Sequence, residues 1–462
     1  MAKPSIPQGT RDFSAEVVRK RNYIFSTIRS VFEIYGFEPL ETPAMENLET
    51  LIGKYGEEGD KLMYKILNNG ISNPKNIEKS KAGFEKVLLG KSSSELTERA
   101  LKYDLTIPFA RYVAMNHGVL TFPYRRYQIQ PVWRGDNPQK GRYREFTQCD
   151  ADVVGSTSLL NEVELACIYH EVFTKLKITG YELKVNSRKI LTALAEVCAE
   201  ETKVVEITTA IDKLDKVGID RVKEELKSKE LNDDQVGIIE SYLTMNHATD
   251  TVIGNADKLL FLKSFFSDSI VGLQGIKELE FLINNLPPAV NIVIDQTLAR
   301  GLNYYTGIIF EAKAPAEIKM GSIGGGGRYD DLTGLFGVPN IPGVGISFGV
   351  DRIFDVMTEL NVFPDEVHTG TRVLFFNMGE AESRFAFGKM QQLREQGISC
   401  ELYHETAKIA KQFNYAEKKK IAYAVIIGSK EMEQKYCLVK NLATGLQEVV
   451  VFENLANFFS NT

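Results

Sequence analysis

The sequence predicts an α+β protein built from several domains, and three observations carry this prediction. A chain of 462 residues is too long for one ordinary core, which favours two to four domains. Strand-like segments occur together with amphipathic helices in the first part of the chain and again near its end. Between them, the composition shifts to charged helical patterns. We therefore expect a first domain at 1–360 with a helical insertion at about 187–287, a linker at 361–370, and a C-terminal α/β domain at 371–462.

The individual elements follow from periodicity and from turn residues. Ile24, Ile28 and Val31 recur at helical spacing, and Gly36 is a natural helix end. Loops and a short hairpin are expected at about 54–100, and a glycine-rich turn at 321–337. Further helices are expected in the segments 105–116, 158–177 and 350–360. Strands are expected in the segments 37–43, 124–134, 144–155, 290–314, 341–349, 372–378, 398–403, 421–428, 437–441 and 446–452.

Composition and charge exclude several classes of protein. The net charge is −6 and the isoelectric point about 5.7, so the chain as a whole is not attractive to nucleic acid, and any such contact requires a local basic patch. The five cysteines are scattered and form no C-x-x-C motif, which favours reduced thiols. The first residues lack an apolar signal region, and no run reaches transmembrane length. These features predict a cytoplasmic protein.

Common nucleotide-binding motifs are absent. The segment GVGISFG is one residue too long for G-x-G-x-x-G, and LGKSS lacks the first glycine of a phosphate-binding P-loop. The sequence also contains no H-E-x-x-H. A nucleotide site in this chain therefore requires another arrangement of residues.

A basic loop lies between the two strands expected at 124–134 and 144–155. Arg134, Lys140, Arg142 and Arg144 crowd together in the segment VWRGDNPQKGRYREFTQCDAD, with only Asp136 to oppose them in the loop itself. Surface hairpins are often charged, so a solvated loop is one interpretation. The other is a phosphate-binding loop, because guanidinium groups bind phosphate oxygens in a bidentate manner.

Arg300 and Arg352 lie in distant segments and have comparable settings, so three arginines could surround one phosphate chain. For any single arginine, a surface ion pair is the simpler explanation. Hydroxyls and acceptors are supplied by Asp104, Thr106, Gln148, Asp152, Tyr304 and Tyr305. Packing with a satisfied hydroxyl is the alternative for the tyrosines. The glycines at 324–327 permit close approach of a ligand to the backbone.

Several of these segments together resemble the histidyl-tRNA synthetases, a family of class II aminoacyl-tRNA synthetases. The matching segments are QGTRDF, VWRGDNPQKGRYREFTQCDADVVG, RGLNYYTGIIFE, GGGGRYDDL and GVGISFGVDRI, and they occur in one order along nearly the whole chain. The resemblance implies a catalytic domain with a mainly antiparallel sheet of the class II fold and a C-terminal anticodon-binding domain. It also implies a homodimer, whose contact element resembles the first helix and strand ending at Pro43.

The resemblance implies the activation of L-histidine with ATP to histidyl-adenylate and transfer of the histidyl group to the 3′ end of tRNA(His). Arg134 and Arg300 resemble the catalytic pair at the α-phosphate. Arg142 and Arg352 match the β/γ-phosphate end and the adenine, and Phe146 matches a stacking face for the base. Asp136 stands where the class II pattern usually has glutamate. Mg²⁺ is expected on the β- and γ-phosphate oxygens.

The same resemblance assigns the amino-acid and tRNA contacts. Asp104, Thr106 and Gln148 match the grip on the α-amino group. The residues that match the readers of the imidazole ring are Asp152, Tyr304 and Tyr305, with Tyr329 lying nearby. The expected tRNA contacts of the loop are Gln139, Lys140 and Arg144. Plausible phosphate contacts in the C-terminal domain, each of which could equally be a solvated helix face, are Lys408, Lys411, Lys418, Lys419 and Lys420.

Three other readings remain. The first is a non-charging paralogue that acts as a regulatory histidine- or tRNA-binding subunit, such as the regulatory subunit of ATP phosphoribosyltransferase; relatives of that kind tend to lack the C-terminal domain and the phosphate arginines. The second is a stress-sensing RNA-binding module, which would need a signalling domain for which no room remains. The third is another class II specificity, against which the RGLNYY segment argues. Neither DNA nor a membrane is expected as a partner.

Overall fold

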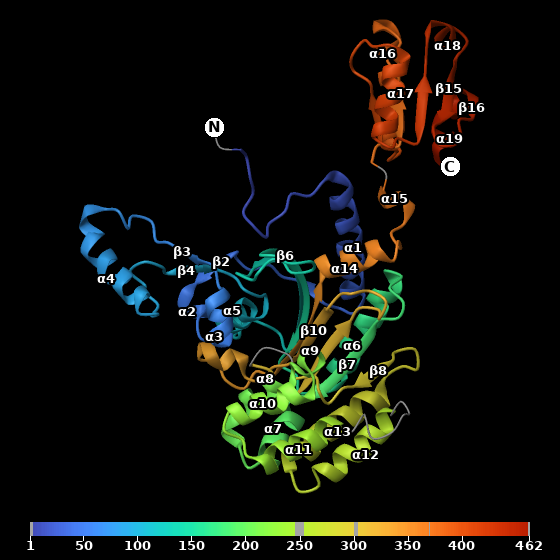
Figure 1. Cartoon of the computed structure of the whole chain (residues 1–462). Coiled ribbons are helices and arrows are strands. Elements are labelled where there is room, and N and C mark those ends of the chain that lie inside the picture. Colours follow the sequence, from blue (N-terminus) through green and yellow to red (C-terminus); the bar gives the residue numbers. More distant parts are fainter. Residues whose placement is uncertain (1–2, 245–253, 300–303, 369, 461–462) are drawn as a thin grey trace. The chain divides into compact units, whose positions relative to one another are not determined.

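The computed structural model describes residues 3–244, 254–299, 304–368 and 370–460. The chain divides into two compact units, one formed by residues 1–11 and 24–362 and the other by residues 12–23 and 363–462 (Figure 1). Each unit has its own sheet. Helix α1 (Ala15–Ile34) supplies its second half to the first unit, where Ile24, Ile28 and Phe32 are fully buried.

An eight-stranded sheet forms the centre of the first unit. Its strand order is β1-β5-β6-β11-β10-β9-β7-β8, and only the outer pairs β1–β5 and β7–β8 are parallel. The expectation of a mainly antiparallel sheet is therefore confirmed. The strands are β1 (Glu38–Pro39), β5 (Tyr124–Trp133), β6 (Glu145–Val154), β7 (Glu182–Ser187), β8 (Ile292–Ile294), β9 (Ile308–Lys313), β10 (Ser322–Arg328) and β11 (Gly343–Gly349).

The two longest strands, β5 and β6, pair in an unbroken antiparallel ladder from Tyr124 opposite Val154 to Trp133 opposite Glu145. This is the hairpin that the alternating sequence predicts on either side of the basic loop. Because side chains alternate along a strand, every second residue of β6 faces the same side of the sheet. One face of the sheet is covered by α1 and α6 (Leu160–Lys175). There, Phe348 of β11 packs against Phe32 of α1 and Tyr169 of α6.

The glycine-rich segment at 321–337 is not a turn, as the sequence analysis expected, but begins as the central strand β10. The glycines are needed because this strand lies against close neighbours on both sides. A Cβ atom at Gly326 would lie 2.2 Å from the carbonyl oxygen of Gly345, and one at Gly324 would lie 2.7 Å from the Tyr169 ring. Glycine here marks close approach of backbones in a sheet and not a reversal of the chain.

Helices and turns make up the described residues between β7 and β8, and they carry a core of their own around Tyr242 and Phe266. Tyr242 donates to the carbonyl oxygen of Gln296, and Lys258 donates to that of Ile294, so this core is fixed to the edge of the sheet. The α-helices are α7 (Arg188–Val197), α8 (Val204–Ile211), α9 (Leu214–Val217), α10 (Ile219–Ser228), α11 (Asp233–Thr244), α12 (Asn255–Phe265) and α13 (Ile270–Asn285).

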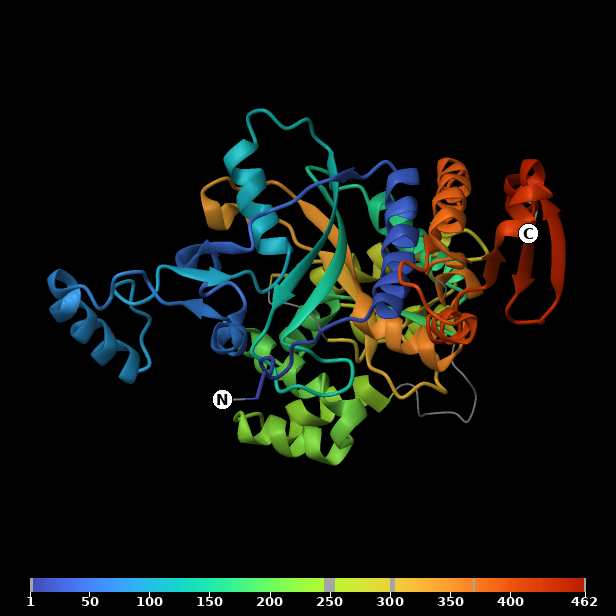
Figure 2. The same ribbon diagram turned by 90° about the horizontal axis from the view of Figure 1, so that it is seen from above.

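The segment from residue 45 to residue 101 contains more helix than the loops and hairpin that were expected. A small sheet of order β2-β4-β3 accompanies α2, α3 and the twelve-residue helix α4 (Ile77–Leu88). Helix α4 lies apart from the eight-stranded sheet in both views (Figures 1 and 2). The remaining elements are β2 (Met45–Asn47), α2 (Leu48–Leu51), α3 (Gly56–Leu62), β3 (Lys65–Ile66) and β4 (Arg99–Leu101), followed by α5 (Thr106–Asn116).

The second unit contains a five-stranded mixed sheet of order β13-β12-β14-β15-β16, with parallel pairing among the first three strands and antiparallel pairing among the last three. Its strands are β12 (Val373–Phe375), β13 (Cys400–Leu402), β14 (Tyr423–Ile426), β15 (Tyr436–Asn441) and β16 (Gln447–Val451). Its helices are α15 (Asp365–His368), α16 (Glu380–Glu395), α17 (Ile409–Lys418), α18 (Ser429–Glu433) and α19 (Leu455–Ser460). Across the described parts of both units, no helix has the length and apolar content needed to cross a membrane.

Candidate active site

Two adjoining cavities lie on the face of the large sheet opposite α1 and α6. The larger has a volume of about 430 Å³ and the smaller about 50 Å³. The strands β6, β10 and β11 contribute to the walls of both, where glycine and serine leave space above the backbone. Arg134, Gln148, Tyr305 and Ser347 line both cavities and therefore mark their junction.

Arg134 ends the β5 side of the hairpin and is held from two directions. Its Nε donates to the carbonyl oxygen of Tyr103 at 3.0 Å, and its guanidinium lies over the Tyr103 ring, 4.3 Å from the centroid. The Phe146 ring flanks it at 5.2 Å. Because Nε is engaged, the guanidinium is fixed at the junction of the cavities with its two terminal nitrogens remaining for a ligand.

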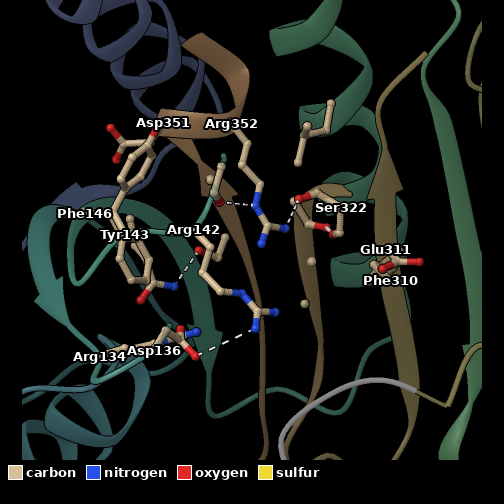
Figure 3. A pocket seen from close by; sticks show the side chains of 18 of the residues that line it. Arg134, Asp136, Arg142, Tyr143, Phe146, Phe310, Glu311, Ser322, Asp351 and Arg352 are labelled. Carbon is tan, nitrogen blue, oxygen red and sulfur yellow. Dashed lines mark hydrogen bonds and ion pairs between the residues drawn. The ribbon is translucent and has the colours of Figure 1, made fainter. Parts of the chain in front are cut away.

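Arg352, Arg142 and Asp136 lie on the wall of the larger cavity (Figure 3). In helix α14 (Val350–Glu359), Arg352 donates from Nε to Gly141 O at 2.7 Å and from Nη1 to Ser322 O at 2.6 Å. Arg142 is exposed and lies 3.9 Å from a carboxylate oxygen of Asp136. The two arginines therefore surround the cavity from α14 and from the hairpin loop.

Glu311 is one of three carboxylates that line the larger cavity. It is buried on β9, and Ser322 supplies a hydroxyl oxygen on the same wall (Figure 3). Of the other two carboxylates, Asp136 faces Arg142, and Asp351 accepts from Arg11 at 2.5 Å. No cluster of three or more histidine, cysteine or acidic side chains suited to a metal occurs in the described residues. The donor set therefore fits a hard cation that takes most of its ligands from phosphate and water.

The smaller cavity brings together all seven of the side chains expected to bind histidine. They come from the start of α5 and the loop before it, from β6, and from the segments flanking β9 and β10. These residues are Asp104, Thr106, Gln148, Asp152, Tyr304, Tyr305 and Tyr329. The sequence analysis assigned their roles by resemblance, and these roles stay predictions.

Asp104 lies at the bottom of this cavity and is almost fully buried. Its carboxylate accepts from Tyr55 at 2.9 Å, from Tyr304 at 3.2 Å and from the backbone N–H of Ile107 at 3.1 Å. Burial raises the pKa of Asp104, and these donors oppose that rise. The group is a fixed acceptor that suits an ammonium ion.

Asp152 is equally buried and has two strong partners. The Tyr329 hydroxyl donates to Oδ1 at 2.5 Å, and Nη2 of Arg126 lies 2.8 Å from Oδ2. Burial raises the pKa of Asp152, while the guanidinium of Arg126 favours the ionised form. Arg126 itself is fully buried, so this is an internal ion pair that fixes the wall of the cavity.

Gln148 stands between the two cavities and is oriented by β11. Its Nε2 donates to Ser347 Oγ at 2.9 Å, while its buried Oε1 has no hydrogen-bond partner among the described residues. Thr106 is the first residue of α5, where the backbone N–H groups of a helix begin. Both residues therefore offer polar atoms to a ligand.

The expected tRNA contacts do not line these cavities. Arg300 lies outside the described residues. Gln139 and Lys140 are exposed in the hairpin loop, where Lys140 pairs with Glu359. Arg144 donates to the carbonyl oxygens of Asp136 at 3.2 Å and Gln8 at 3.4 Å. The five C-terminal lysines are exposed on or beside α17.

The sequence analysis missed several residues of the site. Asp150 and Glu311 line the cavities, Arg126 pairs with Asp152, and Arg11 contacts the hairpin loop. The alternation along β6 could have identified Asp150, because it lies between Gln148 and Asp152 in the same register. Arg11 lies in the QGTRDF segment, but the sequence analysis assigned it no role, because its contacts depend on the fold.

The antiparallel sheet, the arginine-bearing hairpin and the strand leading into the arginine-bearing helix α14 are together those of a class II aminoacyl-tRNA synthetase. Residues 92–353, more than half of the chain, match the family model for histidyl-tRNA synthetase, and residues 373–462 match that of an anticodon-binding domain. The chain belongs to the histidyl-tRNA synthetase family.

Relatives and solved structures agree with this assignment. A histidine–tRNA ligase from Bacteroides fragilis is 50% identical, with 98% of each chain covered, and one from Christiangramia forsetii is 49% identical with the same coverage. The crystal structure of histidyl-tRNA synthetase from Nostoc sp. PCC 7120 has a TM-score of 0.81 at 32% identity and full coverage of both chains.

Proposed function

We propose that this chain is a histidine–tRNA ligase, which activates L-histidine with ATP and transfers the histidyl group to tRNA(His). The observation that best supports this proposal is a small cavity lined by all seven residues expected to bind histidine. It adjoins, at Arg134, a larger cavity lined by arginines. Nearly full-length relatives at about half identity favour the charging enzyme over the regulatory subunit.

The proposed first step is attack of a histidine carboxylate oxygen on the α-phosphorus of ATP. The new P–O bond forms as the bond to pyrophosphate breaks, and negative charge develops on the α-phosphate oxygens. The position of Arg134 supports its catalytic role, because its guanidinium is fixed where the two cavities meet. Fixed donors aimed at developing charge are the main catalytic device in such transfers. Arg300 is proposed as the second donor at this phosphate.

The larger cavity supports binding of ATP. Arg352 and Arg142 would contact the β/γ-phosphate end and the adenine, Asp136 the adenine, and Phe146 would provide a stacking face for the base. The backbone contacts of Arg352 to Gly141 and Ser322 keep its guanidinium in place without a bound ligand.

Mg²⁺ is proposed to accompany ATP, with Glu311 and Ser322 as its protein ligands. When bound, the cation neutralises charge on the phosphate oxygens. Glu311 supports this proposal as a buried carboxylate on the wall of the larger cavity.

Two sets of residues in the small cavity would contact two different parts of histidine. Asp104, Thr106 and Gln148 would hold the α-amino group, and Asp152 with the tyrosines 304, 305 and 329 would contact the ring. A site that satisfies polar groups in this way rejects analogues that lack them, by roughly 10⁴-fold, without editing.

The tRNA would be contacted at two places. Gln139, Lys140 and Arg144 of the hairpin loop would meet the acceptor stem, and the exposed lysines of α17 would meet the anticodon arm. Lysine and arginine contacts to phosphate strengthen binding without reading sequence. We further propose a cytoplasmic homodimer that does not bind DNA.

Pyrophosphate exchange tests the proposed function. The purified full-length protein is incubated with ATP, Mg²⁺ and labelled pyrophosphate, with each of the twenty amino acids in turn. Exchange with histidine alone is expected. A folded protein that binds histidine but supports no exchange would favour the regulatory paralogue.

The role of Arg300 has its own test. Arg300→Ala should abolish most of the exchange while histidine still binds, because the guanidinium acts on charge that develops in the transition state. Equal loss of histidine binding and exchange would reassign Arg300 to substrate binding or to structure.

A further inference from the structure

Asp150 is a buried carboxylate of the small cavity that the proposed mechanism does not use. It lies on β6 between Gln148 and Asp152, in the register that faces the cavity. Only 3% of its surface is exposed, and within the described residues its Oδ1 has no hydrogen-bond partner. A buried acceptor without a donor costs free energy. Asp150 is therefore placed to receive a donor from a ligand.

Each of the neighbouring carboxylates has partners in the protein. Asp104 accepts from Tyr55, Tyr304 and a backbone N–H group, and Asp152 has Tyr329 and Arg126 as partners. Among the described residues of this cavity, three buried oxygens on β6 have no hydrogen-bond partner, namely Gln148 Oε1, Asp150 Oδ1 and Asp152 Oδ2, and Asp150 is the carboxylate among them that has no ion pair.

The charges around Asp150 leave the cavity short of positive charge. Arg126 forms an ion pair with Asp152, and Arg134 lies at the junction with the larger cavity. Burial raises the pKa of Asp150 to about 7; Arg126 opposes this rise and Asp152 adds to it. The titratable, charged and polar groups around Asp150 on the surrounding elements include Lys102, Asp104, Arg126, Gln128, Arg134, Asp152, Tyr169, Tyr305 and Ser347.

We propose that Asp150 is a specificity-determining residue, which accepts an N–H hydrogen bond from the imidazole ring of histidine and holds that ring as the doubly protonated cation. This inference rests on the proposed histidine specificity. Neutral imidazole has one N–H group and one acceptor nitrogen, whereas the cation has two N–H groups. The two neighbouring carboxylates on β6, Asp150 and Asp152, could each accept one of the two N–H groups of the cation.

The proposal has a thermodynamic consequence. The imidazole ring of free histidine has a pKa of about 6.5, so it is mostly neutral at pH 8. Binding as the cation then draws one proton from solvent. A site that binds the neutral ring takes up no proton.

Isothermal titration calorimetry in two buffers of different ionisation enthalpy measures this uptake. Histidine is titrated at pH 8 into the full-length wild type, Asp150→Asn and the control Cys149→Ala. Cys149 is the next residue of β6 and does not line the cavity. The wild type and Cys149→Ala should take up most of one proton, and Asp150→Asn should take up almost none and bind histidine at least about tenfold more weakly.

A second measurement does not depend on the variant folding. 1,2,4-Triazol-3-yl-alanine has nearly the shape of histidine, but its ring is far less basic. The wild type should bind it at least about tenfold more weakly than histidine and without proton uptake. Equal affinity for the two ligands would overturn the proposal.

The outcomes separate this inference from the proposed function. Normal pyrophosphate exchange with histidine, combined with no proton uptake in the wild type or unchanged uptake in Asp150→Asn, overturns the inference alone. A wild type that neither binds histidine nor exchanges pyrophosphate with it overturns both.

Discussion

The guanidinium of Arg11 stacks on the ring of Tyr143, with its central carbon 3.2 Å from the ring centroid. Its Nη2 also donates to Asp351 at the start of α14, at 2.5 Å. Nearby, the backbone N–H of Arg144 donates to the carbonyl oxygen of Gly9. The N-terminal segment thereby joins the hairpin loop to the helix that carries Arg352, and both form walls of the larger cavity.

Replacing Arg11 by alanine should therefore weaken ATP binding without affecting the histidine cavity. Loss of the stacking and of the charge-assisted hydrogen bond should raise the KM for ATP on the order of tenfold. The KM for histidine should change by less than about twofold, on the same order-of-magnitude basis. Both constants are measured by pyrophosphate exchange.

Two further variants make this result specific. Arg11→Lys keeps the charge but not the planar stacking, and should recover only part of the affinity for ATP. Arg221→Ala removes an exposed helical ion pair on α10 and should change neither constant. Equal increases of both KM values in Arg11→Ala would instead indicate a general loss of structure.

The sequence predicted those parts of the fold that depend on local patterns. The β5–β6 hairpin follows from alternation on either side of turn residues, α5 from the proline near its start, and α6 from its amphipathic pattern. Strand β10 was misread as a turn, because glycine signals both reversal and close packing, and only the neighbours of Gly326 decide between them. Helix α4 was missed because glycine, serine and asparagine clusters surround it.

The site was predictable to a similar degree. Resemblance supplied the residues proposed to bind histidine and ATP, and alternation on β6 could have supplied Asp150. Arg11 and Asp351 are 340 positions apart, and Arg126 acts through an internal ion pair. Such contacts exist only once the chain has folded, so no local pattern contains them.

Asp152→Asn should affect histidine far more than ATP. The substitution removes the negative charge that pairs with Arg126. It also removes one carboxylate oxygen as an acceptor for the imidazole ring, which Asp152 is proposed to contact. The KM for histidine should rise about 100-fold, and that for ATP by less than about threefold. Steady-state pyrophosphate exchange with each substrate varied in turn provides the comparison, and an unchanged KM for histidine would remove Asp152 from the amino-acid site.

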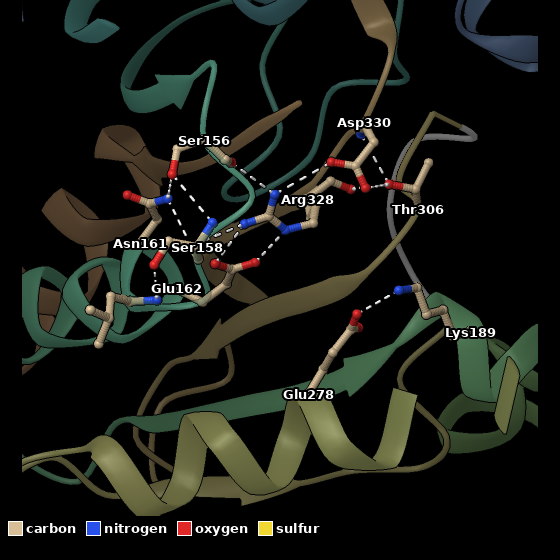
Figure 4. A network of polar contacts seen from close by, with 10 residues as sticks. Ser156, Ser158, Asn161, Glu162, Lys189, Glu278, Thr306, Arg328 and Asp330 are labelled. Atoms are coloured by element: carbon tan, nitrogen blue, oxygen red, sulfur yellow. Dashed lines mark hydrogen bonds and ion pairs between the residues drawn. The ribbon is translucent and has the colours of Figure 1, made fainter. Parts of the chain in front are cut away.

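The buried ion pair between Arg328 and Glu162 should be a main support of the first unit. Nε and Nη2 of Arg328 donate to the two carboxylate oxygens at 2.6 and 2.8 Å, and both side chains are buried (Figure 4). Glu162→Ala leaves the buried guanidinium with only the more exposed Asp330, 3.3 Å from Nη1, as a counter-charge, which should cost about 3 kcal/mol of unfolding free energy. Denaturation followed by the fluorescence of Trp133, the only tryptophan, reports on this unit.

Two variants control this measurement. The double variant Glu162→Leu with Arg328→Met should lose less stability than Glu162→Ala, because no charge is left unpaired. Glu278→Gln breaks the more exposed pair with Lys189 and should also cost less (Figure 4). A Glu162→Ala variant as stable as the wild type would show that the pair contributes nothing net.

Lys102 should make the stability of the first unit depend on pH in the alkaline range. Its buried ammonium group donates to Gln130 Oε1 at 2.5 Å and Thr42 O at 3.1 Å, and burial lowers the pKa of Lys102 from 10.5 to about 8. Between pH 8 and 10.5 the unfolded chain holds a proton at this lysine that the folded chain has released. The unfolding free energy therefore rises with pH in this window.

The comparison with Lys102→Met isolates this effect, because methionine does not titrate. Below pH 8 the wild type bears the full cost of a buried charge, and above pH 10.5 that cost is gone. The unfolding free energy of the wild type relative to the variant should thus increase by about 3 kcal/mol across the window. Denaturation curves followed by Trp133 fluorescence at several pH values measure this difference. A difference that stays constant with pH would mean that Lys102 has the same pKa in the folded and unfolded chains.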